Sequence, residues 1–227
     1  MKKIAVFKQG VLEELPLQLG VFPFGIIYGI MAIESGLTPT QAFLMSSIIF
    51  GGASQIAFVQ LISSATPLGV IVTTVSAINS RHFLYSISMM EYLKNLSLKW
   101  RIVLAYLLTD EAYAVSIRRF INEPSTSFLH FHLLGTGITL FLSWQTSTLM
   151  GVLLGSDLPQ FLDLQFIIPL TFIAIIVPMI NSISSFFVVI ASAFSGLILK
   201  SLDINFWIII SGIIGVVIGL ASSRLDK

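Results

Sequence analysis

The sequence contains no cysteine, which excludes disulfides, thiolate metal sites and cysteine nucleophiles. Charge is almost as scarce, because Lys, Arg, Asp and Glu together make up 10% of the 227 residues, against about 25% in ordinary soluble domains. Hydrophobic residues make up 56% of the chain, and its mean hydropathy is +0.95. So few charges cannot cover a water-facing surface. The sequence therefore predicts an integral membrane protein embedded in a lipid bilayer.

Several classes of protein are disfavoured by what else is missing. A formal net charge of +1 provides no basic surface for nucleic acid. The H-E-x-x-H and G-x-S-x-G motifs are absent, and we expect neither an enzyme nor a cofactor or metal site. The N-terminal stretch lacks an A-x-A-like cleavage site and is interrupted by Glu13, Glu14 and Pro16, so we expect it to be retained.

Long apolar stretches fill most of the chain and are close to the length of about 20 residues that a membrane helix needs. We count eight, or seven crossings if one is re-entrant. No stretch fits a soluble domain, and we expect residues 1–227 to form a single membrane-embedded, all-α domain of seven to eight transmembrane segments. The segments cover approximately residues 17–33, 40–63, 67–90, 102–120, 129–154, 166–180, 183–199 and 206–221.

Proline and glycine interrupt the first segment at Pro23-Phe24-Gly25. A proline inside a helix costs about 3 kcal/mol. One interpretation is a kinked but continuous helix, and the other is a broken helix that exposes backbone amides at a binding site. A faint correspondence with Pro169–Phe172, five segments later, leaves an inverted repeat as an open alternative.

Small and polar residues occupy the centre of the second segment. Gly51, Gly52 and Ser54 permit close helix packing, and lining a binding site is the alternative. Gln55 favours the site, because a buried amide group needs hydrogen-bond partners. Trp144, near the centre of the fifth segment, also favours a pocket wall, since tryptophan usually prefers the membrane interfaces.

An arginine lies in the third segment, in the stretch Asn79–Tyr85. Arginine at the centre of a membrane helix costs about 2.5–3.5 kcal/mol, so Arg81 is predicted to have a partner and to face the protein interior or a water-filled cavity. On one helix, Asn79 and His82 share a face and Arg81 and Tyr85 lie on the adjacent one. The alternative is a helix that ends near Asn79, with Arg81 and His82 at the lipid headgroups.

Two adjacent acids, Asp110 and Glu111, interrupt the fourth segment. Three roles are open for them: carrying a proton, pairing with Arg81, or binding an ammonium group. Alternatively, the segment is re-entrant and its acids contact water. On a continuous helix, Tyr106 and Tyr113 share a face with Asp110.

Two histidines, His130 and His132, lie near a predicted membrane boundary, at the start of the fifth segment. We interpret them as interfacial residues and not as a metal pair.

The polar motifs follow one another in a specific order, and together they resemble the AzlC family, the large subunits of branched-chain amino acid exporters. The resemblance covers roughly residues 9–200, and Ser80 is a minor departure from an otherwise matching Asn-x-Arg-His motif. The motifs that carry it are Pro23–Gly25, Gly52–Gln55, Asn79–Tyr85, Thr109–Tyr113, Trp144 with Gly151 and Gly155, and Leu162–Phe172.

The resemblance implies a secondary transporter that carries leucine, isoleucine and valine, with methionine as a further candidate, out of a bacterial cell across its inner membrane. It also implies a second, small membrane subunit of the AzlD type. The remaining alternatives are a transporter of another small amino acid or metabolite, a channel, and a structural subunit of a membrane complex.

A zwitterionic amino acid needs donors for its carboxylate, acceptors for its ammonium group and a dry pocket for its side chain. Amides of a broken helix or Arg81 suit the carboxylate. We expect the substrate-binding residues to be Pro23, Phe24, Gly25, Gly51, Gly52, Ser54, Gln55, Asn79, Arg81 and Trp144. We expect the proton-coupling residues to be Asp110, Glu111, Arg81 and His82.

Overall fold

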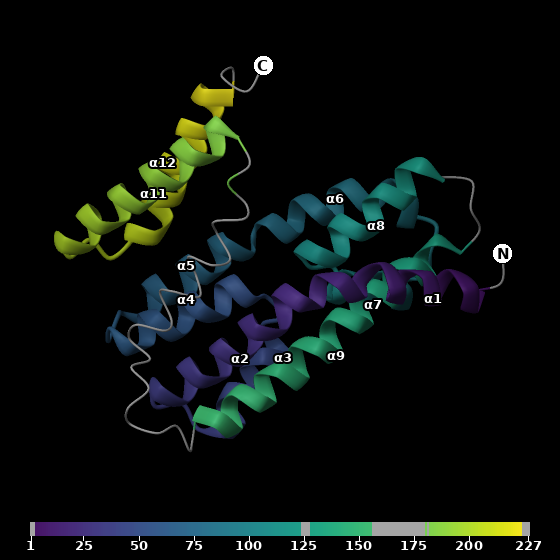
Figure 1. Cartoon of the computed structure of the whole chain (residues 1–227), viewed down its shortest axis with the longest axis horizontal. Helices are drawn as coiled ribbons and strands as arrows, with labels where there is room; N and C mark the ends of the chain where they lie inside the picture. The colour runs from purple at the N-terminus through teal and green to yellow at the C-terminus, as the bar shows by residue number, and fades with distance from the viewer. Residues whose placement is uncertain (1–2, 124–127, 156–179, 181, 224–227) are drawn as a thin grey trace. The chain divides into compact units, whose positions relative to one another are not determined.

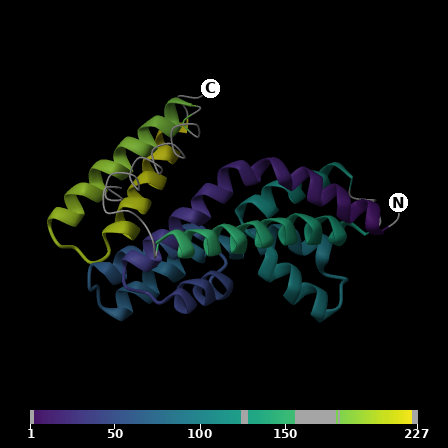
Figure 2. The ribbon, with the colours of Figure 1, turned by 60° about the horizontal axis from the view of Figure 1, so that its bottom comes forward.

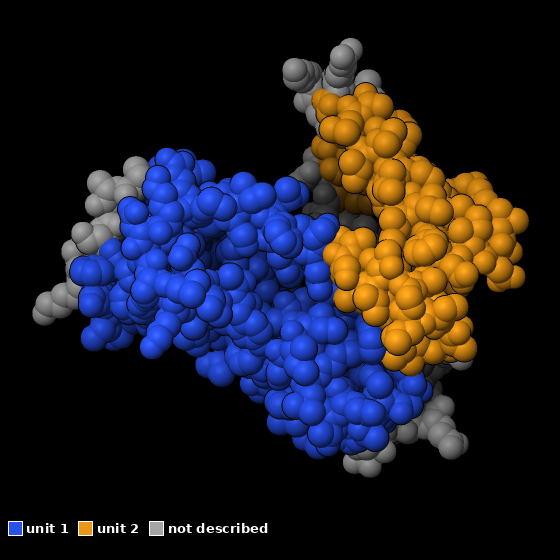
Figure 3. All heavy atoms as spheres, turned by 180° about the vertical axis from the view of Figure 1, so that it is seen from behind, with its two compact units in different colours: residues 1–60, 79–158 blue, residues 61–78, 159–227 orange. Residues whose placement is uncertain are grey.

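The computed structural model describes residues 3–123, 128–155, 180 and 182–223, and every regular element in these residues is a helix. The all-α prediction is therefore confirmed for this part of the chain. Contacts divide the chain into two compact units, coloured separately in Figure 3: residues 1–60 with 79–158, and residues 61–78 with 159–227. The helices are α1 (Lys3–Glu14), the short 3-10 helix η1 (Leu15–Leu17), α2 (Gln18–Glu34), α3 (Pro39–Ile48), α4 (Gly52–Ser63), α5 (Leu68–Asn79), α6 (Arg81–Leu93), α7 (Leu98–Leu107), α8 (Asp110–Asn122), α9 (Leu129–Gly155), α11 (Ile183–Ser201) and α12 (Trp207–Ser222).

Three helical stretches are long and apolar enough to cross a membrane: Lys3–Glu34, Leu129–Gly155 and Ile183–Ser201. The predicted number of seven to eight crossings is not established by helix length. The second, third and fourth predicted segments each consist of two helices of 10 to 13 residues, which are too short to cross alone. The sixth segment, and with it the correspondence that suggests an inverted repeat, lies outside the described residues.

Local sequence explains where α3 begins. Thr38 accepts a hydrogen bond from the Gln41 backbone N–H (3.3 Å), and the Thr38 N–H donates to Gln41 Oε1 (2.9 Å). This reciprocal capping box satisfies two of the N–H groups that a helix start leaves without partners. Pro39 occupies the first helical position, where its missing N–H costs nothing.

The first unit is built around α9, and α1 and α2 lie along it (Figures 1 and 2). Glycines make the close approach of α2 and α9 possible. A Cβ added at Gly29 would lie 2.5 Å from the carbonyl oxygen of Thr148, and one added at Gly151 would collide with the carbonyl oxygen of Ile26. Gly29 and Gly151 therefore act as packing residues where α2 meets α9.

We expect Gly151→Ala to destabilise the first unit, because its new methyl group would meet backbone atoms that cannot rotate away. Overpacking of this kind costs about 1–3 kcal/mol. Gly20→Ala is the matched control, since nothing lies within 4 Å of a Cβ at Gly20 in α2. Thermal unfolding in detergent should show a lower Tm for Gly151→Ala and no loss for Gly20→Ala. Equal Tm values would contradict this account of the α2–α9 contact.

A buried polar network joins α1 to α8 and α9. His132 is fully buried, and its Nε2 lies 2.9 Å from Glu13 Oε2. Arg119 bridges Glu13 (3.7 Å) and Glu123 (3.1 Å). The position of His132 near a membrane boundary stays a prediction, but its side chain does not face lipid, because α1 covers it: a Cβ at Gly10 would collide with the His132 carbonyl oxygen.

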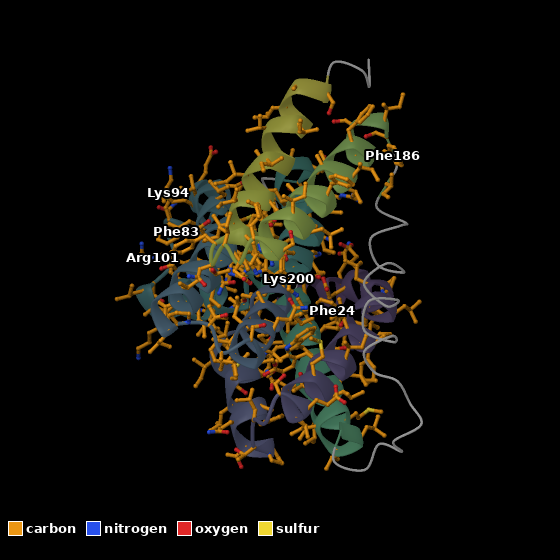
Figure 4. All side chains as sticks on the ribbon, turned by 90° about the vertical axis from the view of Figure 1, so that its left-hand side faces the viewer. Phe24, Phe83, Lys94, Arg101, Phe186 and Lys200 are labelled. Carbon is orange, nitrogen blue, oxygen red and sulfur yellow. The ribbon has the colours of Figure 1, made fainter. Side chains whose placement is uncertain are left out.

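The second unit contains α11 and α12, which pack against each other as a hairpin (Figure 1). Ser184 and Ser222 share a hydrogen bond of 2.8 Å between their hydroxyl oxygens. At the opposite end of the hairpin, the ammonium group of Lys200, labelled in Figure 4, lies 5.5 Å from the centre of the Trp207 ring. No residue predicted to bind substrate or protons lies in α11 or α12.

Candidate functional site

The second and fourth predicted membrane segments leave the helical conformation near their centres, whereas Ser80, between α5 and α6 of the third segment, stays helical (φ −57°, ψ −24°). Residues 49–51 separate α3 from α4, and Ile49 leaves the helical conformation with φ −103° and ψ 74°. Leu108 and Thr109 separate α7 from α8, with ψ values of 87° and −176°. By contrast, α2 continues through Pro23, so the alternative of a helix broken at Pro23–Gly25 is wrong. The backbone groups released by a broken helix therefore belong to the second and fourth segments.

The break between α3 and α4 is held by hydrogen bonds. Ser54 Oγ and the Gln55 N–H both donate to the carbonyl oxygen of Gly51, at 2.7 and 3.0 Å. The Tyr106 hydroxyl of α7 donates to the carbonyl oxygen of Ser47 (2.5 Å), near the helix end where carbonyls lack intrahelical donors. The prediction that Tyr106 shares a helical face with Asp110 is wrong, because the second break separates the helices that carry them.

Arg81 is paired with Asp110. Its guanidinium lies 2.8 Å from Asp110 Oδ2, and the Tyr85 hydroxyl donates to Asp110 Oδ1 (2.7 Å). α5 ends at Asn79, but Ser80 stays helical and α6 follows at once from Arg81, and Arg81 has the ionic partner that the first interpretation required. The headgroup position of the second interpretation stays a prediction. About a third of each side chain in the pair is exposed (33% and 36%), so the pair is accessible from outside the unit.

Asn79 and His82 lie beside the break. A Cβ added at Gly51 would lie 3.2 Å from Asn79 Oδ1, 3.6 Å from His82 Cε1 and 3.0 Å from Ser54 Oγ. The prediction that Asn79 and His82 face the same side is therefore confirmed. His82 also contacts the Tyr85 ring (5.9 Å between centres), which connects the break to the Arg81–Asp110 pair.

Aromatic side chains lie on the other side of the break. A Cβ added at Gly52 would lie 2.8 Å from Trp144 Cη2 and 2.9 Å from Phe24 Cε1. Phe24, labelled in Figure 4, packs on Trp144 with ring centres 5.9 Å apart, and Tyr28 stacks on the same indole at 6.3 Å. Gly25 lies against Trp144 as well, with 3.4 Å from its added Cβ to Trp144 Cε3. Since Gly51 and Gly52 are consecutive, the polar and the aromatic residues meet at one place.

Several buried polar atoms at this place have no hydrogen-bond partner within the described residues. Gln55 is fully buried and lies beside the Tyr28 hydroxyl, but neither its amide nitrogen nor its oxygen makes a hydrogen bond of ordinary geometry within the described residues. The nearby Tyr28 hydroxyl donates instead to the carbonyl oxygen of Ala42 (2.8 Å). Unpaired buried polar groups cost about 1–3 kcal/mol each, so such a group usually has a functional reason. The others at this place are Asn79 Oδ1, His82 Nε2 and Trp144 Nε1, and a further one, Thr109 Oγ1, lies at the second break.

The structure therefore brings together nine of the predicted residues at or next to the break: Phe24, Gly25, Gly51, Gly52, Ser54, Gln55, Asn79, His82 and Trp144. Arg81 and Asp110 form an adjoining ion pair. Pro23 is exposed on α2, and Glu111 occupies the first turn of α8. Within residues 3–123, 128–155, 180 and 182–223, no three His, Asp or Glu side chains are placed to hold a metal ion.

Sequence reasoning missed Glu14 and Gln18. Glu14 is fully buried where α1 meets η1, and Gln18 Nε2 donates to its Oε1 (3.0 Å). The sequence did contain a signal. The two polar residues are four positions apart beside the first apolar segment, and side chains at this spacing contact each other on a helix.

Comparison with known proteins identifies the family of the chain. Residues 16–158, well over half of the chain, match the family described as AzlC protein. The chain belongs to the AzlC family. The match includes both helix breaks and every predicted site residue.

AzlC-family relatives come from archaea and bacteria. An uncharacterized membrane protein of Archaeoglobus fulgidus is 32% identical over 70% of this chain and 67% of its own length. The inner membrane protein YgaZ of Escherichia coli is 27% identical over 69% and 64%. The branched-chain amino acid transport protein AzlC of Bacillus subtilis is 26% identical over 67% and 59%. The matched part of this chain thus spans about two thirds or less of these relatives. No solved structure matches it.

Proposed function

We propose that this AzlC-family protein is a secondary active exporter of leucine, isoleucine and valine, and also of methionine, in the cytoplasmic membrane of a bacterium. The family and the Bacillus subtilis relative support a role in membrane transport. The observation that carries the proposal is the group of unpaired, buried polar atoms at the break between α3 and α4. Such atoms suit a polar ligand that binds and dissociates in each transport cycle.

Each part of a zwitterionic amino acid has suitable groups at this break. The amides at the N-terminus of α4, together with Gln55 Nε2 and Trp144 Nε1, suit its carboxylate, because a helix start attracts anions. Asn79 Oδ1 and Gln55 Oε1 suit its ammonium group. The rings of Phe24 and Trp144 suit an aliphatic side chain. Arg81 is already engaged by Asp110, so we assign it to coupling.

Coupling to the proton gradient is proposed to involve Asp110, Glu111, Arg81 and His82. The Arg81–Asp110 pair is connected to the break through Tyr85 and His82. A proton on Asp110 would remove its negative charge and weaken its hold on Arg81, and a helix divided into halves can then move one half against the other. Export would follow if the proton is exchanged with the outside during each cycle.

The proposal includes a partner and a topology. We expect a small AzlD-type membrane subunit to work with this chain, seven to eight membrane crossings built from divided helices, and no enzymatic activity.

Counterflow in proteoliposomes tests the function. Vesicles are loaded with unlabelled leucine, valine, methionine or phenylalanine, with and without the co-produced small subunit, and entry of labelled leucine is measured. We expect saturable counterflow with the first three and little with phenylalanine. Single-channel conductance would indicate a channel instead, and the absence of counterflow with every amino acid, in the presence of the small subunit, would contradict the proposal.

A further inference from the structure

Glu14 is an acid buried inside the first unit, with 0% of its surface exposed. Its Oε1 accepts a hydrogen bond from Gln18 Nε2 (3.0 Å). Its Oε2 and the Gln18 Oε1 are also buried, and neither has a hydrogen-bond partner in the part of the chain that the structure describes. The carboxyl and amide groups thus form one of the two hydrogen bonds that such a pair can make.

A proton on Glu14 would provide the second hydrogen bond of this carboxyl–amide pair. With Glu14 ionised, its Oε2 and Gln18 Oε1 are both acceptors and cannot bond to each other. With a hydrogen on Oε2, the carboxyl group becomes a donor as well, and it can complete the pair by donating to the amide oxygen while it accepts from the amide nitrogen. The protonated form also avoids the large cost of burying an isolated charge.

The charged surroundings of Glu14 also favour a proton. Glu111, in the first turn of α8, is the charged group that acts on Glu14 from the elements packed against it, and it carries the same sign. No ion pair joins Glu14 to a cation among the described residues: Arg81 pairs with Asp110, and Arg119 and His132 face the adjacent Glu13 instead. The helices that carry the two acids, α1 and α8, pack against each other, and two like charges on packed helices are costly to ionise together, which favours a proton on the buried Glu14.

We propose that Glu14 and Glu111 form a proton-binding site, and that Glu14 carries the proton whose movement drives transport. The inference deepens the proposed function, on which it rests, by adding a residue outside the predicted coupling set. The proton leaves the Glu14 hydroxyl for the carboxylate of Glu111 and then for water, and each transfer breaks one O–H bond and forms another. Glu111 lies next to Asp110 at the second helix break, so proton loss at Glu14 changes the charge beside the Arg81–Asp110 pair.

The site suits a proton better than a metal ion. Two carboxylates and one amide oxygen provide fewer ligands than Ca²⁺ needs, and Mg²⁺ demands a complete octahedral shell.

The test compares three variants in the assembled complex. Glu14→Gln keeps the shape and a hydrogen-bonding side chain but cannot carry a proton. Gln18→Leu keeps the acid and removes its amide partner. Glu34→Gln, an exposed acid at the end of α2, is the matched control. Leucine counterflow at equal pH and leucine flux driven by a pH gradient are both measured in proteoliposomes. Infrared difference spectra across a pH titration report the C=O stretch of protonated carboxyl groups.

We expect Glu14→Gln to retain counterflow within about twofold and to lose gradient-driven flux by about tenfold or more. Its spectrum should lack one protonated-carboxyl band that the unmodified protein and Glu34→Gln both show. In Gln18→Leu this band should remain but shift, because the carboxyl group loses a hydrogen-bond partner.

Three results would overturn the inference. The first is gradient-driven flux that survives in Glu14→Gln, and the second is an unmodified protein whose spectrum lacks the protonated-carboxyl band. The third is flux driven by a sodium gradient instead of a proton gradient. If no leucine counterflow occurs in any protein, the proposed substrate is wrong. The infrared band then still shows whether Glu14 binds a proton. If Glu14→Gln does not fold, the shift of this band in Gln18→Leu provides the same answer.

Discussion

Replacing Asp110 by asparagine is expected to reduce pH-gradient-driven leucine transport by about tenfold or more and to lower the Tm. The change leaves the Arg81 guanidinium without its counter-charge, and Tyr85 loses a charged acceptor. Removing one member of a buried ion pair costs about 3–5 kcal/mol, while exposed pairs contribute about 0–1 kcal/mol. With roughly a third of each side chain exposed, this pair should lie between the two.

A double-mutant cycle separates a coupling role from a purely structural one. Arg81→Gln combined with Asp110→Asn removes both charges, so the Tm should recover relative to either single variant. Transport should not recover, because the charge pair that responds to the proton is still missing. Glu91→Gln, an exposed acid at the end of α6, is the control and should behave like the unmodified protein. Recovery of gradient-driven transport in the double variant would show that the pair only holds helices together.

Replacing Gln55 by leucine is expected to weaken leucine binding by about 10- to 150-fold, since a hydrogen bond to a charged group contributes about 1.5–3 kcal/mol. Stability without substrate should change little, because the removed amide makes no hydrogen bond of ordinary geometry among the described residues, and the neighbouring Tyr28 hydroxyl keeps its bond to the Ala42 carbonyl oxygen. Binding is measured by isothermal titration calorimetry and stability by thermal unfolding, both in detergent.

Gln145 provides the matched control for this variant. It is also a buried glutamine, but its Oε1 accepts from the Ser47 hydroxyl (3.1 Å) and its Nε2 donates to the carbonyl oxygen of Ser46 (3.1 Å). Gln145→Leu should therefore lower the Tm, because both partners lose a hydrogen bond inside the unit. If the two variants lost stability equally, Gln55 would be a packing residue and not a ligand-binding one.

The individual helix breaks show where sequence reasoning stops. The Gly51-Gly52 pair suggested either packing or a site, and the structure places a break directly before α4. Pro23 gave the stronger sequence signal for a broken helix, yet α2 is continuous there. Proline weakens one backbone hydrogen bond wherever it lies, but whether a helix breaks depends on what its released groups contact. At the real break, the released carbonyl of Ser47 is satisfied by Tyr106, 59 residues later.

The sequence by itself determined that this is an all-helical membrane protein of the AzlC family and that Arg81 needs a partner. These conclusions follow from local properties, namely the scarcity of charge, the length of the apolar segments and the cost of an arginine within them. Only the tertiary structure decided that Asp110 is this partner, that Gln145 has hydrogen-bond partners in α3 while Gln55 has none of ordinary geometry, and that Glu14 is fully buried. The physical reason is that burial and hydrogen bonding depend on side chains from other helices. These helices are far apart in the chain and become neighbours only when α6 packs on α8 and α3 packs on α9.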